Sequence, residues 1–152
     1  MNTPAASPVQ TAAHEIASVH ASPRLHSLLS IAVAVAVGGA LASGFLVYQN
    51  FVLANRNADA KRSISLFVVI GLIALFTAWN TPRDFLSFML SVGIPQITVT
   101  VLAAWNLQAA LFTSHRAAGG KFRSIAFALI VGVVANAAIK GLFYGISVAK
   151  AG

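Results

Sequence analysis

The sequence predicts an all-α membrane protein: a membrane-spanning bundle of four helices, with a short interfacial or re-entrant helix between the second and third spans. Residues 28–48 form a run of 21 residues without a charge. As a helix this run reaches roughly 30 Å, the thickness of the hydrocarbon core of a bilayer. Three similar apolar runs follow it. Only 9% of the 152 residues are charged, against about a quarter in a soluble domain, so there is too little charge to coat a surface in water.

The charge balance indicates lipid headgroups as partners. The chain has ten Lys and Arg residues and three acidic residues, which gives a net charge of +7. Such a balance can suggest nucleic acid, but the basic residues fall in loops between apolar runs and do not form one patch. We therefore expect no nucleic-acid binding, and contacts with anionic headgroups instead. The residues expected to make these contacts are Arg56, Lys61, Arg62, Arg116, Lys121 and Arg123.

The chain divides into a polar tail and a membrane domain. Residues 1–22 are rich in Ala, Ser, Thr and Pro, and we interpret them as a mobile tail. Ser22 and Pro23 are typical of a helix start, and residues 23–150 form the predicted domain. His14, His20 and His26 recur every six residues, a spacing that fits no zinc motif, so we expect them to be exposed histidines.

The first span, residues 28–48, carries small residues at four-residue steps. Ala36, Ala40 and Gly44 lie on one helical stripe, which lets a second helix approach closely. Gly141 and Gly145 form a similar pair near the end of the chain. We expect all five to serve helix packing. A secretory signal with a cleavage site at Ala40-Leu41-Ala42 is the competing interpretation, but the apolar run continues past that site.

The later spans are bounded by turn and capping residues. The second span covers residues 64–80 and stops at Pro82, because proline cannot continue the hydrogen-bond ladder. The segment 82–93 is expected to form a short helix in or at the membrane interface, followed by a third span over 96–112. The alternative is one long bent third helix that starts at Phe85. The fourth span is expected over residues 124–147.

The distribution of basic residues predicts the orientation. The loops after the first and third spans carry most of the Lys and Arg residues, so the positive-inside rule places them in the cytoplasm. With four spans both termini then lie on the same side, in the periplasm.

The polar residues inside the spans are few. The three acids, Glu15, Asp59 and Asp84, lie outside the spans, and the chain has no cysteine. This argues against acid–base catalysis, metal binding and cofactor attachment, so we predict no enzymatic activity, metal or cofactor. A candidate polar face remains inside the membrane, made of Asn106, Gln108, Asn136 and Lys140. It is expected to join helices by hydrogen bonds, or alternatively to line a polar path or small-ligand site.

Two segments carry a resemblance to a known group of proteins. Residues 38–51 and 107–124 contain Gly39, Gly44, Asn50, Gln108, His115, Gly119 and Gly120 in an order that resembles small multi-pass bacterial membrane proteins of unassigned function. Ala40 stands where that group commonly has proline. The resemblance covers about a third of the chain. It implies a location in the bacterial inner membrane and implies no activity.

These observations predict a non-enzymatic packing or accessory protein of the inner membrane, which acts as a homo-oligomer or as a subunit of a membrane complex. Two alternatives stay open. One is a small channel or carrier formed by oligomerisation. The other is an immunity or stress protein that binds a partner within the membrane.

Overall fold

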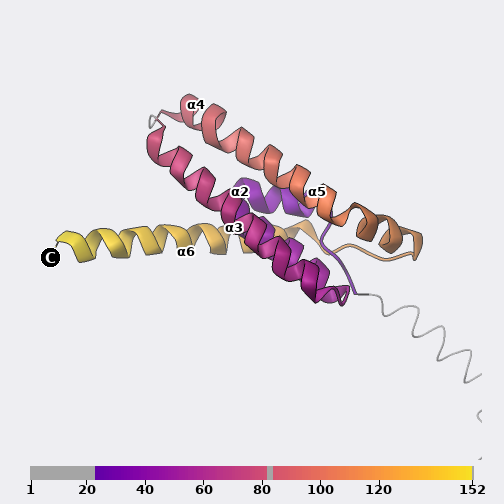
Figure 1. The fold of residues 1–152 in the computed structure, drawn as a ribbon. Helices are drawn as coiled ribbons and strands as arrows, with labels where there is room; N and C mark the ends of the chain where they lie inside the picture. Colours follow the sequence, from indigo (N-terminus) through magenta and orange to yellow (C-terminus); the bar gives the residue numbers. More distant parts are fainter. Residues whose placement is uncertain (1–22, 82–83, 152) are drawn as a thin grey trace, which may run out of the picture.

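The computed structural model describes residues 23–81 and 84–151, with side chains described as far as Leu142. The regular elements in this part are all helical, and four stretches are long and apolar enough to cross a membrane. This confirms the all-α fold class; the predicted tail, 1–22, lies outside the described residues. The elements are α2 (Leu28–Leu53), α3 (Asn57–Asn80), α4 (Phe85–Phe88), the π-helix η1 (Met89–Gly93), α5 (Ile94–Ala117) and α6 (Ile125–Ala151) (Figure 1).

Helix α2 is folded back on itself at Gly39. This residue has φ 72° and ψ −171°, a conformation that is essentially restricted to glycine because it lacks a Cβ atom. The backbone of His26, just before α2, is hydrogen-bonded to the side chain of Asn50, near the opposite end of α2. A straight helix would hold these two residues about 36 Å apart. The two halves of α2, residues 28–38 and 40–53, therefore form a hairpin.

The hairpin changes the interpretation of the first apolar run. Each half of α2 is only about 16 to 21 Å long at 1.5 Å per residue, less than the roughly 30 Å of a bilayer core. The sequence prediction counted apolar length and could not place the break, so the straight span expected over residues 28–48 is not what the chain forms. Seven of the twelve largest fully buried side chains among the described residues nevertheless come from this hairpin, which lies in the middle of the molecule (Figure 1).

Each half of the hairpin has its own neighbours. Helix α6 lies along the first half, where the backbones of Gly38 and Gly132 approach closely. Helix α3 lies along the second half, where Gly44 faces the side chain of Phe67. Helix α5 also packs on the second half, as the hydrogen bond from Gln108 to the carbonyl of Val47 shows. The C-terminal part of α6 runs clear of the other helices (Figure 1).

The segment before α5 continues into it as one helix. Residues 85–117 form a single helical stretch of 33 residues, so the alternative prediction of one long third helix is correct, and a separate interfacial helix is not formed. Asp84 caps its start by accepting a hydrogen bond from the backbone N–H of Ser87 at 2.8 Å. That N–H lowers the pKa of the Asp84 carboxyl below its ordinary value. The π-helical turn η1 just before Pro95 widens the helix where a proline ring would otherwise clash with the preceding turn.

Three segments meet at one end of the bundle: residues 23–27, 54–56 and 118–124. We call this end the loop end, and we include in it the adjoining turns of α3 and α5, residues 57–62 and 115–117. Leu25 and Phe122 form an isolated parallel bridge, and the N–H of Arg123 donates to the carbonyl of Leu25 at 2.8 Å. Residues 23–27 therefore lie beside the third loop. The orientation predicted from four straight spans had placed these segments on opposite sides of the membrane, and the hairpin is the reason for the difference.

The outer faces of the helices are apolar. Large hydrophobic side chains such as Leu72, Phe76 and Ile130 are 60% to 73% exposed. Small and polar side chains, including Ser43, Ser63 and Thr100, are fully buried instead. A water-soluble domain buries its large apolar side chains, whereas lipid is as apolar as leucine and allows them to face outward. The arrangement is that of a membrane protein.

Candidate functional site

A cluster of buried polar side chains joins three parts of the chain at the loop end. We call it the polar cluster; it consists of His26, Gln49, Asn50 and Gln108. The Asn50 amide accepts from the backbone N–H of His26 at 2.6 Å and donates to its carbonyl at 2.9 Å. It also donates to Oε1 of Gln108 at 3.1 Å, and Gln108 in turn donates to the carbonyl of Val47 at 3.0 Å. One amide thus closes the α2 hairpin and ties it to α5.

The imidazole of His26 is enclosed by this cluster. Its Nε2 lies 3.0 Å from Oε1 of Gln49, and its ring stacks on Phe127 of α6 at a centroid distance of 5.2 Å. Burial lowers the pKa of the His26 side chain, the hydrogen bond to Gln49 opposes this, and the charge of Arg123 lowers it further. Nδ1 is buried without a hydrogen-bond partner among the described residues. Burial thus favours the neutral imidazole, and the contact with Oε1 of Gln49 favours the tautomer in which Nε2 donates.

A second polar contact lies at the break in α2. The side-chain amide of Asn136, on α6, donates to the carbonyl of Val37 at 2.7 Å. The last carbonyls before a helix end have no partner within the helix, and Val37 is two residues before Gly39. Asn136 therefore stabilises the break by supplying a donor that the interrupted helix lacks.

The four residues of the predicted polar face are not brought together. Gln108 belongs to the buried polar cluster, and Asn136 serves the α2 break. Asn106 and Lys140 are exposed on the outer surface of their helices. The expected continuous face does not exist because Asn106 and Gln108, two positions apart, lie on different sides of α5.

Only some of the predicted packing residues lie at helix contacts. Ala40 and Gly44 are buried, and a Cβ atom added to Gly44 would come within 2.5 Å of Cβ of Phe67. Ala36 is exposed, and Gly141 has nothing within 4 Å of an added Cβ atom. The stripe from Ala36 to Gly44 is interrupted because α2 reverses at Gly39. Gly145 lies outside the residues whose side chains are described.

The basic residues gather at the loop end. Three arginines lie over phenylalanine rings there, at 5.3 to 5.7 Å from the ring centroids. The pairs are Arg56 with Phe51, Arg116 with Phe122, and Arg123 with Phe127. Arg56 also forms an exposed ion pair with Asp59 at 2.7 Å. Lys61, Arg62 and Lys121 are exposed. The arrangement places cations and aromatic rings together, as at a membrane interface.

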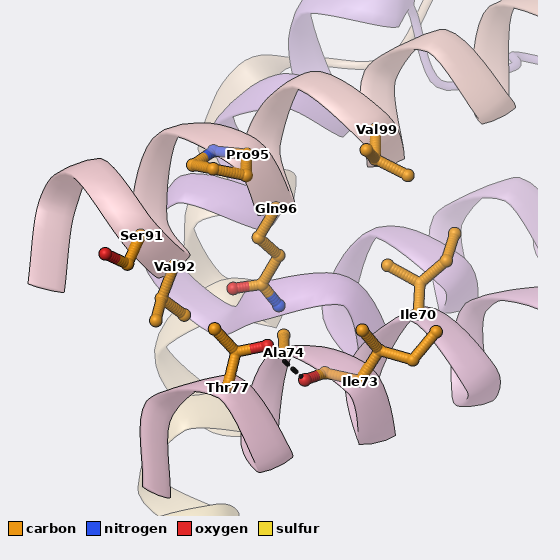
Figure 2. Close-up of a pocket in the computed structure, with 9 residues that line it drawn as sticks. All are labelled: Ile70, Ile73, Ala74, Thr77, Ser91, Val92, Pro95, Gln96 and Val99. Carbon is orange, nitrogen blue, oxygen red and sulfur yellow. Dashed lines mark hydrogen bonds between the residues drawn. The ribbon is translucent and has the colours of Figure 1, made fainter. Parts of the chain in front are cut away.

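A cavity of about 130 Å³ lies between α3 and the helical stretch 85–117, near the hairpin turn at Gly39. Its lining consists of Ile70, Ile73, Ala74, Thr77, Ser91, Val92, Pro95, Gln96 and Val99. Figure 2 shows the side chain of Gln96 extending from α5 toward Ala74 and Thr77 on α3. The lining residues come from α3 and from the stretch 85–117, and Gly39 of α2 lies close to them: a Cβ atom added to Gly39 would be 3.4 Å from Nε2 of Gln96.

Sequence reasoning missed the roles of His26, Gln49 and Asn50. The six-residue histidine spacing predicts an exposed His26, but its side chain is fully buried. The signal that points to the cluster is the resemblance, whose residues include Asn50 and Gln108, which are hydrogen-bonded to each other. Its other residues also have structural roles: Gly39 makes the hairpin turn, and Nε2 of His115 donates to the carbonyl of Lys121, 3.1 Å away.

Across residues 23–81 and 84–151, no three His, Asp or Glu side chains gather as metal ligands would. Comparison with known proteins adds no constraint, because no family model, curated protein or solved structure matches the chain.

Proposed function

We propose that the chain is a non-enzymatic multi-pass protein of the bacterial inner membrane that acts by packing, with itself or as an accessory subunit of a membrane complex. The observation that carries this proposal is the use of its internal polar groups. The amides of Gln108 and Asn136 are hydrogen-bonded to other parts of the same chain. A channel or carrier for a polar solute would keep such groups free along the path of that solute.

The proposed topology follows from the α2 hairpin. Helices α3 and α6 and the stretch 85–117 cross the membrane, whereas α2 enters and leaves from the loop end. The loop end faces the cytoplasm, because among the described residues it carries seven basic side chains and one acid, Asp59. The basic side chains are Arg24, Arg56, Lys61, Arg62, Arg116, Lys121 and Arg123. In this topology the C-terminal end of α6 lies on the periplasmic side, opposite residue 23.

The same end is the proposed contact with anionic headgroups. The arginines over Phe51, Phe122 and Phe127 combine a charge for the phosphate with a ring for the interfacial region. In nanodiscs that contain both lipids, we expect native mass spectrometry to retain phosphatidylglycerol over phosphatidylcholine. Equal retention of the two lipids would contradict the headgroup contact.

Purification of the full chain in a mild detergent tests the packing role. Native mass spectrometry of the purified sample is expected to show a homo-oligomer or a stoichiometric complex with another membrane protein. The second result would also accommodate a membrane immunity or stress protein, whose partner would be identified in the same spectrum. A monomer without any associated protein, at every detergent concentration that keeps it folded, would refute the proposal.

A small channel or carrier is the second candidate, and the break at Gly39 favours it. Transporters often bind their substrates where a membrane helix is interrupted. Dye-loaded proteoliposomes separate the two functions. The packing role predicts the same ion and small-solute leakage as empty liposomes. Leakage that depends on the protein, and that changes in the Asn136→Leu variant, would favour the channel.

A further inference from the structure

We propose that the cavity between α3 and the stretch 85–117 is a binding site for a small, neutral, single-ring molecule that carries a hydroxyl or carbonyl group and reaches the site through the lipid. This inference is independent of the packing role. It requires only that the protein is folded in a membrane or a membrane mimetic.

The size of the cavity sets the size of the ligand. Its volume is about 130 Å³, and an engineered apolar cavity of about 150 Å³ in another protein binds benzene. A single six-membered ring therefore fits, whereas a sterol or a nucleotide does not. Six of the nine lining residues, among them Ile70, Val92 and Val99, are apolar and suit such a ring.

Gln96 gives the cavity its hydrogen-bonding character. Within the described part of the chain no side chain or backbone group is hydrogen-bonded to its amide, which extends between the two helices (Figure 2). An amide offers two donor hydrogens and an acceptor oxygen, and leaving them unpaired in an apolar environment is unfavourable. The hydroxyl of Thr77 donates to the carbonyl of Ile73 at 2.9 Å, so its oxygen can still accept. A ligand hydroxyl or carbonyl would satisfy Gln96.

The charge and the access of the cavity complete the description. None of its lining residues is ionisable, so a charged ligand would lose its hydration without gaining a counter-ion. Ile73 and Val99 are 62% and 51% exposed, which means that the cavity reaches the outer, lipid-facing surface of the helices. Phenols and quinones combine the required ring, polar group and solubility in lipid.

Binding of two fluorinated probes tests the proposal. The full chain in nanodiscs is titrated with 4-fluorophenol and with fluorobenzene, and ¹⁹F NMR follows the bound probe, with empty nanodiscs as the partitioning blank. Both probes are expected to bind saturably. The phenol should bind roughly three- to tenfold tighter, the range that one hydrogen bond contributes.

Three variants assign the binding to this cavity. Gln96→Leu should reduce the affinity for 4-fluorophenol to that for fluorobenzene. Ala74→Phe should abolish binding of both probes by filling the space, whereas Leu72→Phe, on the exposed side of the same helix, should leave both affinities unchanged. Far-UV circular dichroism and thermal unfolding confirm that each variant is folded.

Several results would overturn the proposal. Absence of saturable binding to the natural chain would exclude a ligand site of this class. Equal affinities for the two probes, or an unchanged affinity in Gln96→Leu, would mean that Gln96 contributes no hydrogen bond to a ligand and is satisfied by water. Binding that survives Ala74→Phe would place the ligand elsewhere.

Discussion

Replacement of Asn50 by alanine should destabilise the protein more than any other amide substitution described. The Asn50→Ala variant loses the hydrogen bonds to the N–H of His26, to its carbonyl and to Oε1 of Gln108. All three partners are buried and would be left without a bond. Hydrogen bonds of this kind contribute about 1 kcal/mol each in soluble proteins and about 0.6 kcal/mol in membrane proteins. We therefore expect the free energy of unfolding to fall by about 2 to 3 kcal/mol.

Unfolding in mixed detergent micelles measures this effect. The folded fraction is followed by far-UV circular dichroism as the mole fraction of dodecyl sulfate increases. Asn106→Ala is the matched control, because the side chain of Asn106 is exposed and makes no hydrogen bond to another described residue. This variant should change the free energy of unfolding by less than about 0.5 kcal/mol. The double variant Asn50→Ala/Gln108→Ala should lose less stability than the sum of the losses in Asn50→Ala and Gln108→Ala, because the two residues share a hydrogen bond. Equal effects of Asn50→Ala and Asn106→Ala would refute the role of the polar cluster.

Three further predictions use the same unfolding assay. Gly39→Ala should lower the free energy of unfolding by about 1 to 3 kcal/mol, because alanine disfavours the backbone conformation of Gly39. Gly141→Ala should leave the free energy of unfolding unchanged. Equal changes in the two variants would argue against the hairpin turn. Gly38→Ala should cost about 1 to 3 kcal/mol, because its Cβ atom would lie 2.5 Å from the carbonyl oxygen of Gly132; a neutral effect would mean that these helices are not in close contact. Acidification from pH 7.5 to 5 should lower the free energy of unfolding. The pKa of His26 in the folded state lies below its ordinary value of 6.5. As the pH falls through 6.5, the unfolded chain therefore binds a proton more readily than the folded chain does, and unfolding is favoured. The His26→Gln variant should show a smaller pH dependence of stability. An unchanged pH dependence in this variant would mean that His26 is not its source.

The helices could be predicted from the sequence because their signals are local. Long uncharged runs give the helical elements, and the pair Gly119–Gly120 marks where the chain turns after α5. Gly119 has φ 71° and Gly120 donates its N–H to the carbonyl of His115 at 2.8 Å, which closes α5 as the glycines suggest.

The hairpin could not be predicted because its cause is not local. Gly38 and Gly39 are as compatible with a straight packing stripe as with a reversal, and the choice depends on contacts with residues far away in the sequence. Asn50 closes the hairpin through His26, 24 positions earlier, and Asn136 supports the break from α6, 99 positions after Val37. The apolar period along one helix contains no information about these partners.

The same limit explains the errors in the candidate site. Asn106 and Gln108 are both amides in one apolar run, and the sequence alone does not say which of them faces the bundle. Only the packed structure shows that Gln108 is directed toward Val47 and Asn50, while Asn106 is exposed.

Labelling of single cysteines tests the re-entrant hairpin most directly, since the chain has no cysteine of its own. Arg24→Cys and Asn57→Cys flank α2, and Asn80→Cys marks the other end of α3. A membrane-impermeant maleimide, applied to intact cells and to inverted vesicles, should reach positions 24 and 57 from the same side and position 80 from the opposite one. Labelling of positions 24 and 57 from opposite sides would show that α2 crosses the membrane and would contradict the hairpin.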